Sequence, residues 1–181
     1  MTVWAIVGPP GVGKGTFLNT LKAVLKDGLK CVSFGDRCRQ LVKVEDPFMM
    51  EVVDTMKRTQ LGSLQRENLT LQRNLYVTAQ LIEREFTGSL PNMVILDNFP
   101  RSIPELQFLA EHNIDVRCIM LDIYDHEAVH YVERISRRKR GDNARLRIQE
   151  YLLSTRHSMN DMIETERNSI RIEVSADASP E

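Results

Sequence analysis

The 181-residue sequence predicts an α/β protein with a doubly wound, five-stranded parallel sheet and helices on both faces. Two observations support this prediction: short apolar runs rich in Val and Ile recur along the chain, and helical patterns separate them. Several of the runs are apolar almost throughout, as strands buried on both faces are. Strands that alternate with helices favour a parallel sheet with right-handed crossovers. In such sheets, ligands bind beyond the carboxyl ends of the strands.

The apolar runs place the expected strands at 3–8, 29–34, 93–99, 116–124 and 170–175. Apolar residues at helical spacing predict a helix that follows Thr16 and ends near Gly28, and a long helix from Leu64 to Phe86. Helical patterns also cover 102–112, 126–138 and 143–166. We expect a single domain over 1–181, because the length suits one core and no linker or repeat is visible. Residues 35–64 exceed a simple crossover and predict a small inserted lobe.

Composition excludes several classes of protein. The formal net charge of −1 argues against nucleic-acid binding by the whole surface, so a basic site must be local. Three cysteines without a C-x-x-C pair fit a reducing compartment. The N-terminus lacks the pattern of a signal peptide, and no apolar run approaches the length of a membrane span. We therefore expect a cytoplasmic protein with no membrane partner.

The stretch GPPGVGKGT, from Gly8 to Thr16, predicts a phosphate-binding loop. Gly8, Gly13 and Lys14 match G-x-x-x-x-G-K between an expected strand and an expected helix. Glycines allow backbone amides to turn toward phosphate oxygens, and the positive end of the helix dipole points into the same space. The alternative is an ordinary Gly/Pro turn, which the flanking strand and helix disfavour. The residue after the lysine is Gly15, and the hydroxyl comes one place later at Thr16.

A second motif, LDNFPRS at 96–102, ends the third expected strand. A carboxylate at a strand end beside a phosphate loop is well placed to hold the water shell of Mg²⁺, and Asp97 is that candidate. Arg101 follows on the same edge of the sheet. The alternative for Asp97 is a helix cap or turn residue.

An arginine-rich segment, 134–147, carries the basic residues Arg134, Arg137, Arg138, Lys139, Arg140, Arg145 and Arg147. Its one acidic residue is Asp142. Alternatives to a phosphate site are a solvated helix face and a nucleic-acid patch. No aromatic residue is interleaved, which weakens single-strand binding.

Together these motifs resemble the adenylate kinase family over residues 3–175. The family's GxPGxGKGT appears as GPPGVGKGT, its GD-x-x-R as GDRCR at 35–39, and its DGFPR as DNFPR at 97–101. Its arginine-rich lid with R-x-D-D resembles RISRRKRGDN at 134–143, and its R-L-x-x-Y resembles RIQEY at 147–151. The resemblance implies a monomeric, ATP-dependent nucleoside monophosphate kinase that uses Mg²⁺ and transfers the γ-phosphoryl group to a nucleoside monophosphate.

The resemblance also implies roles for individual residues. The ATP phosphates would contact the loop residues Gly11, Val12, Gly13, Lys14, Gly15 and Thr16, with Thr16 and water-mediated Asp97 serving the metal. The acceptor would be bound by Gly35, Asp36, Arg39 and Arg101. Arg134 would lie along ATP, and residues 134–147 would form a short lid.

Arg138, Arg140 and Arg147 would converge on the transferring group, with Asp142 orienting one of them. Arg137 and Lys139 are alternatives to Arg140 as the lid residue, because the lid is shorter than the family's. The composition suits the reaction, since phosphoryl transfer depends on positioning and charge stabilisation.

Three further departures from the family pattern are visible. Asn143 replaces the second acid of R-x-D-D, and the printed sequence ends at SADASPE, where the family continues into a last helix. Glu105 stands where adenylate kinases carry a glutamine that reads adenine. A carboxylate only accepts hydrogen bonds, and guanine offers two adjacent donors. We therefore expect GMP, or another base, to be as reasonable an acceptor as AMP, unless the base is read elsewhere.

Three other functions compete with this interpretation. HEAVH at 126–130 matches the zinc-protease pattern H-E-x-x-H, but a protease would leave the phosphate loop and DNFPR unexplained. A small-molecule kinase with a non-nucleotide acceptor is disfavoured by GDRCR and DNFPR together. A P-loop protein that binds nucleotide with little or no catalysis is the alternative from a different class.

Overall fold

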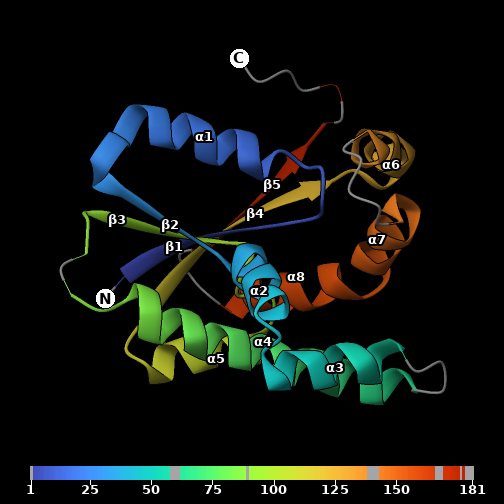
Figure 1. Ribbon diagram of the computed structural model, residues 1–181. Coiled ribbons are helices and arrows are strands. Elements are labelled where there is room, and N and C mark those ends of the chain that lie inside the picture. The colour runs from blue at the N-terminus through green and yellow to red at the C-terminus, as the bar shows by residue number, and fades with distance from the viewer. Residues whose placement is uncertain are drawn as a thin grey trace.

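The computed structural model in Figure 1 is an open sheet enclosed by helices. The structure describes residues 2–57, 62–88, 90–137, 143–165, 169–175 and 177.

The sheet has five parallel strands in the order β2-β3-β1-β4-β5. They are β1 (Thr2–Val7), β2 (Leu29–Ser33), β3 (Met93–Asp97), β4 (Asp115–Ile123) and β5 (Ile170–Val174). Each lies at one of the predicted apolar runs, and the predicted fold class is confirmed.

Strand β1 is the centre of the core. Val3, Ala5, Ile6 and Val7 have no exposed surface, and β3 and β4 pair with β1 on its two sides. The register sets Ile6 beside Asp97. Because the strands are parallel, the loop after β1 and the segment after β3 leave the sheet at the same edge. β5 is an edge strand and is mostly exposed.

Helices cover both faces of the sheet. In Figure 1, α1 lies on one side of the sheet, and α4 and α5 lie on the other. The α-helices are α1 (Lys14–Leu25), α2 (Phe34–Lys43), α3 (Pro47–Lys57), α4 (Ser63–Glu85), α5 (Ile103–Glu111), α6 (Ala128–Ser136), α7 (Ala144–Glu150) and α8 (Arg156–Thr165). Short 3₁₀ turns, η1 (Lys26–Gly28) and η2 (Asp125–Glu127), follow α1 and precede α6.

Two predicted segments have more internal structure than the sequence pattern indicates. The helix expected over 143–166 is interrupted by a π-helical turn, η3 (Tyr151–Thr155), between α7 and α8. Helices α2 and α3 make up most of the described part of the segment predicted as an insertion over 35–64. Residues 138–142 of the predicted lid lie outside the described residues.

Candidate functional site

A cavity of about 740 Å³ lies at the edge of the sheet where β1 and β3 end. The phosphate loop, the start of α2, one side of α4, the segment after β3 and the α7–α8 region contribute its walls. Its polar and charged lining residues are Lys14, Ser33, Asp36, Arg39, Arg66, Thr70, Arg73, Asp97, Asn98, Arg101, Arg147, Glu150, Tyr151 and Thr155. The volume is in the upper part of the range for small-molecule sites.

The loop between β1 and α1 has the backbone of an anion site. Gly13 precedes α1 with a φ of 110°, in the left-handed region, and no side chain caps the first amides of the helix. Those amides and the helix dipole therefore favour a negative group in the cavity. Lys14 Nζ donates to the carbonyl oxygens of Gly8 at 2.7 Å and Pro9 at 2.8 Å, which holds the side chain along the loop.

Gly8 is required by space as well as by conformation. Its φ is 145°, and a Cβ at this position would lie 2.1 Å from the carbonyl oxygen of Leu121 on β4. Any side chain would push the loop off the sheet. The close approach of Gly8 to β4 fixes where the loop begins.

Asp97 is the last residue of β3 and is half-buried beside the loop. Burial raises the pKa of its carboxyl group, while the charge of Lys14 and a hydrogen bond from the Ser33 side chain oppose that shift. The next residue, Asn98, has a φ of 69° and donates its amide to Ile6 O at 2.8 Å. Asn tolerates this left-handed backbone, which explains why it can stand where the resembled motif has glycine.

The start of α2 brings a second motif to the cavity. Ser33 caps the helix by accepting a hydrogen bond from the amide of Asp36 at 3.3 Å. Asp36 and Arg39, one turn apart, form an ion pair, and both line the cavity with Gly35. GDRCR therefore lies at the cavity, as the sequence predicts.

Arg101 faces the cavity from the segment after β3. Its guanidinium carbon lies 5.3 Å from the centroid of the Phe34 ring, a cation–π arrangement that orients the side chain. Among the described residues, none accepts a hydrogen bond from its buried Nε. A bound anion could supply such an acceptor.

Helix α4 adds cavity residues that the sequence analysis missed. Arg66, Thr70 and Arg73 follow one another at helical spacing on one side of α4, and all three line the cavity. The spacing was visible in the sequence, but nothing there indicated that this side of α4 meets the phosphate loop.

Among the described residues, the cavity lining carries six cationic and three acidic side chains. The cations are Lys14, Arg39, Arg66, Arg73, Arg101 and Arg147, and the acids are Asp36, Asp97 and Glu150. Burial lowers the pKa of the Arg73 guanidinium, and the nearby charge of Arg101 acts in the same direction. The cavity therefore favours polyanionic ligands, although the whole chain has a net charge of −1.

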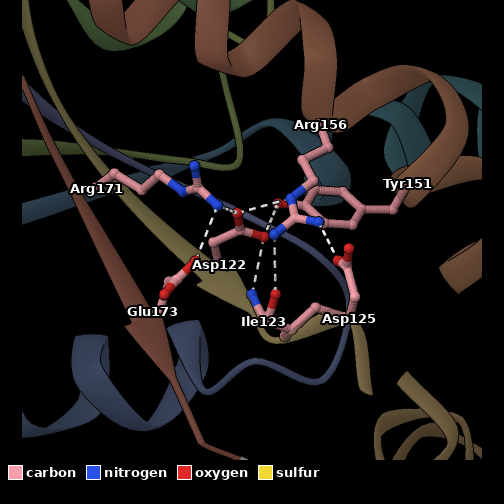
Figure 2. A network of polar contacts seen from close by, with 7 residues as sticks. All are labelled: Asp122, Ile123, Asp125, Tyr151, Arg156, Arg171 and Glu173. Atoms are coloured by element: carbon pink, nitrogen blue, oxygen red, sulfur yellow. Dashed lines mark hydrogen bonds and ion pairs between the residues drawn. The ribbon is translucent and has the colours of Figure 1, made fainter. Parts of the chain in front are cut away.

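One wall of the cavity is held by a buried polar network (Figure 2). Asp122 on β4 is fully buried; its Oδ1 accepts from the Tyr151 hydroxyl at 2.7 Å and from the amide of Ile123 at 2.8 Å. Its Oδ2 contacts Arg156 Nε at 2.8 Å and Arg171 Nη2 at 2.6 Å. Burial, together with the bond to Asp122, raises the pKa of Tyr151. The network fastens the π-helical turn to β4 and β5.

Comparison with known proteins places the chain in a family. Residues 7–151 match the family model described as an AAA domain. The chain belongs to that family. The match begins at the end of β1 and runs through the phosphate loop to Tyr151, so it includes most of the cavity described above.

Curated relatives of the chain include proteins named adenylate kinase. The chain is 32% identical to the adenylate kinase of Thermosipho melanesiensis over 105 residues. This aligned stretch covers 58% of this chain and 44% of the relative. It is 31% identical to the adenylate kinase of Thermotoga petrophila over 112 residues, which are 61% of this chain and 46% of that relative. Thus the match spans less than half the length of these relatives. The resemblance to the adenylate kinase family is confirmed.

Most predicted site residues lie at the cavity, but some do not. Those that line it are Gly11, Gly13, Lys14, Gly15, Gly35, Asp36, Arg39, Asp97, Arg101 and Arg147. Val12 buries its side chain in the core, Thr16 is exposed on α1, and Arg134 is half-buried on α6 outside the cavity lining. Arg138, Arg140 and Asp142 lie outside the described residues, so their roles stay predictions. Asn143 caps α7 by accepting from the amide of Leu146 at 3.1 Å.

Glu105, which the sequence predicts to read the acceptor base, is buried on α5. The side chain is 3% exposed and does not belong to the described cavity lining. Its Oε1 accepts from Asn74 Nδ2 at 2.7 Å, and its Oε2 accepts from the amide of Arg101 at 2.8 Å. Both oxygens already have partners inside the protein, so this placement does not support a role in reading the acceptor base.

The described residues, 2–57, 62–88, 90–137, 143–165, 169–175 and 177, also bear on the zinc-protease alternative and on a membrane span. Within these ranges, no group of three or more His, Cys, Asp or Glu side chains is arranged to hold a metal ion. His126 and His130 of the HEAVH string are exposed near the start of α6. No helix in the described part of the chain is both long and apolar enough to span a bilayer.

Proposed function

We propose that the chain is an ATP-dependent nucleoside monophosphate kinase that transfers the γ-phosphoryl group of ATP to the phosphate of an NMP. The observation that carries this proposal is one continuous cavity that joins the phosphate loop to arginines on α2, on α4 and after β3. A site for ATP alone would need the phosphate loop but not the arginines on α2, on α4 and after β3. Two anionic substrates held together would explain both the loop and these arginines.

The donor side of the proposed site is the loop from Gly8 to Thr16. Its amides and Lys14 would hold the β- and γ-phosphates, as phosphate loops do. Mg²⁺, bound through water at Asp97, would neutralise charge on the phosphates. The residues present fit such an ion, because Asp97 is a half-buried carboxylate at the strand end beside Lys14.

The acceptor side consists of Arg39, Arg73 and Arg101. Guanidinium groups bind phosphate bidentately and stay charged when partly buried. The three arginines come from three different elements, so they can surround a phosphate rather than contact one side of it. Arg147 on α7 lines the same cavity, and it would stabilise the group that is transferred between donor and acceptor.

The proposed reaction asks little covalent chemistry of the protein. An acceptor phosphate oxygen attacks the γ-phosphorus of ATP, the bond to the β–γ bridging oxygen breaks, and ADP leaves with that oxygen. The protein supplies alignment and positive charge, and it must keep water from the γ-phosphate. The base of the acceptor is left to experiment, with AMP and GMP as equal candidates.

The test is ATP-dependent diphosphate formation with AMP, GMP, CMP and UMP, with products separated by chromatography. We expect at least one NMP to yield its diphosphate together with ADP. Lys14→Met should lower the rate by about 10²–10³-fold, the size of one lost oxyanion contact. Lys57→Met is the matched control and should leave the rate unchanged, because Lys57 is an exposed α3 side chain outside the described cavity lining.

Two outcomes would contradict the proposal. ATP binding without phosphorylation of any NMP would favour a nucleotide-binding protein with little catalysis. ADP release at the same rate with and without every NMP would indicate a different acceptor, such as water or a non-nucleotide metabolite.

A further inference from the structure

A buried carboxylate lies behind the acceptor side of the cavity, on α5. Glu105 is 3% exposed, and its neighbour Asn74 on α4 is 5% exposed. Burying an ionised carboxylate is costly unless its oxygens are hydrogen-bonded. Both oxygens of Glu105 are, one to Asn74 Nδ2 at 2.7 Å and the other to the amide of Arg101 at 2.8 Å.

The contacts extend from Asn74 to a second cavity arginine. Asn74 Oδ1 accepts from Arg73 Nη2 at 3.0 Å and from Arg73 Nε at 3.2 Å. Arg73 and Arg101 both line the cavity. One carboxylate therefore contacts the backbone of Arg101 directly and the guanidinium of Arg73 through a single amide.

The direction of these bonds is set by the carboxylate. An ionised carboxylate can only accept, so Asn74 must turn its NH₂ group toward Glu105. Its oxygen then faces Arg73, which can only donate. A glutamine at position 105 would remove this constraint. The amide of Asn74 could then turn round and present its NH₂ group to the Arg73 guanidinium, a contact between two donors.

We propose that Glu105 is a positioning residue that holds Arg73 and Arg101 for an anionic ligand in the acceptor half of the cavity. It acts through Asn74 on Arg73 and through the backbone amide on Arg101. The inference rests on the proposed function only for the identity of that ligand, the phosphate of an NMP. It replaces the base-reading role that the sequence predicted for Glu105.

The chain of hydrogen bonds from Glu105 through Asn74 to Arg73, here called the relay, can be broken by a substitution at position 105 or 74 and restored by combining the two. Glu105→Gln puts an amide opposite Asn74 and frees the amide orientation, whereas Asn74→Asp alone sets two buried carboxylates against each other. In the double variant, the introduced glutamine can again accept from the Arg101 amide through its oxygen, and its NH₂ group can donate to the introduced aspartate. The second oxygen of that aspartate then accepts from Arg73. The double variant thus keeps every hydrogen bond, and the negative charge moves from position 105 to position 74.

The kinetic test compares these variants with Glu111→Gln, an exposed position on the same helix. We expect Glu105→Gln to raise KM for the NMP by about tenfold and to leave KM for ATP within about twofold. The double variant should return the NMP KM to within about threefold of the wild type. Glu111→Gln should match the wild type in both constants.

A base-reading role predicts a different pattern. Glu105→Gln would then change the order of preference among AMP, GMP, CMP and UMP, and adding Asn74→Asp would not reverse that change. A purely structural role would lower kcat for all substrates in step with the folded fraction. Either pattern would overturn the proposal.

A measurement without substrate separates the relay from the proposed function. In a ¹H–¹⁵N spectrum of the free protein, Glu105→Gln should shift the Arg101 amide and Arg73 Nε–H signals, and the double variant should restore them. Unchanged signals in Glu105→Gln would overturn the relay even if the protein proves to be a kinase. Restored signals in a protein that phosphorylates no NMP would retain the relay and reject the proposed function.

Discussion

Asp97, the carboxylate that we propose serves the metal, is held at the end of a strand in the folded chain. It is half-buried at the end of β3, and burial raises the pKa of its carboxyl group above that of the unfolded chain. The folded state therefore binds the proton more tightly than the unfolded state does. The ionised form at neutral pH destabilises the free protein, and this cost grows as pH rises from the unfolded pKa through the folded pKa.

Asp97→Asn should therefore raise the melting temperature of the free protein at pH 7, because the amide carries no charge to desolvate. The gain should shrink as pH falls toward 4, where the wild-type carboxyl becomes protonated. Thermal unfolding at both pH values, without Mg²⁺ or nucleotide, checks this. Phosphoryl transfer by the variant should fall although its stability rises. A variant that is less stable at pH 7 than the wild type would contradict the account.

Single residues differ in how far the sequence could predict them. Gly8, Gly13 and Lys14 were predictable because the phosphate loop is a local motif with fixed spacing. The hydrogen-bond partners of Glu105 were not predictable, because they depend on the packing of α4 against α5. These two helices are separated in the sequence but adjacent in the fold. The sequence shows that a carboxylate stands at position 105, but its direction inside the protein could not be read from its position in a motif.

At the scale of elements, the π-helical turn and the strands beneath it form one unit. Asp122 joins β4 to the turn through Tyr151, to α8 through Arg156 and to β5 through Arg171. This π-helical turn places Tyr151 and Thr155 at the cavity. A wall of the site therefore depends on a carboxylate that is fully buried.

Asp122→Asn should lower the free energy of unfolding by about 3–5 kcal/mol, because it leaves Arg156 and Arg171 without their shared buried anion. Urea denaturation measures this change. Glu173→Gln is the control: Glu173 pairs with Arg171 at 3.1 Å but its side chain is 40% exposed. That variant should lose less than about 1 kcal/mol. Equal losses in the two variants would show that the buried carboxylate has no special role.

Elements were predictable where their cause is local. Apolar runs marked each described strand. For β1, β3 and β4 the reason is burial, because a buried parallel strand must be apolar along most of its length, whereas β5 is mostly exposed. The break in the helix predicted over 143–166 was not predictable. A π-helical turn shifts the backbone bonding by one residue and leaves the apolar spacing almost unchanged, so the hydrophobic pattern continues through it.

At the scale of the whole molecule, charge is separated rather than balanced locally. The chain has a net charge of −1, while the part of the cavity lining that the structure describes has twice as many cationic as acidic side chains. The parallel sheet makes this possible, because the segments after β1, β2 and β3 leave the sheet at one edge. Motifs far apart in the sequence thus meet at a single polyanion site.

The central claim is that this site moves a phosphoryl group from ATP to an NMP. The most direct measurement follows the label of ATP radiolabelled at the γ-phosphate, with and without AMP, GMP, CMP or UMP. The account predicts that label appears in the β-phosphate of an acceptor's diphosphate and that its amount depends on that acceptor. Label that appears only as inorganic phosphate, whether or not an NMP is present, would contradict it.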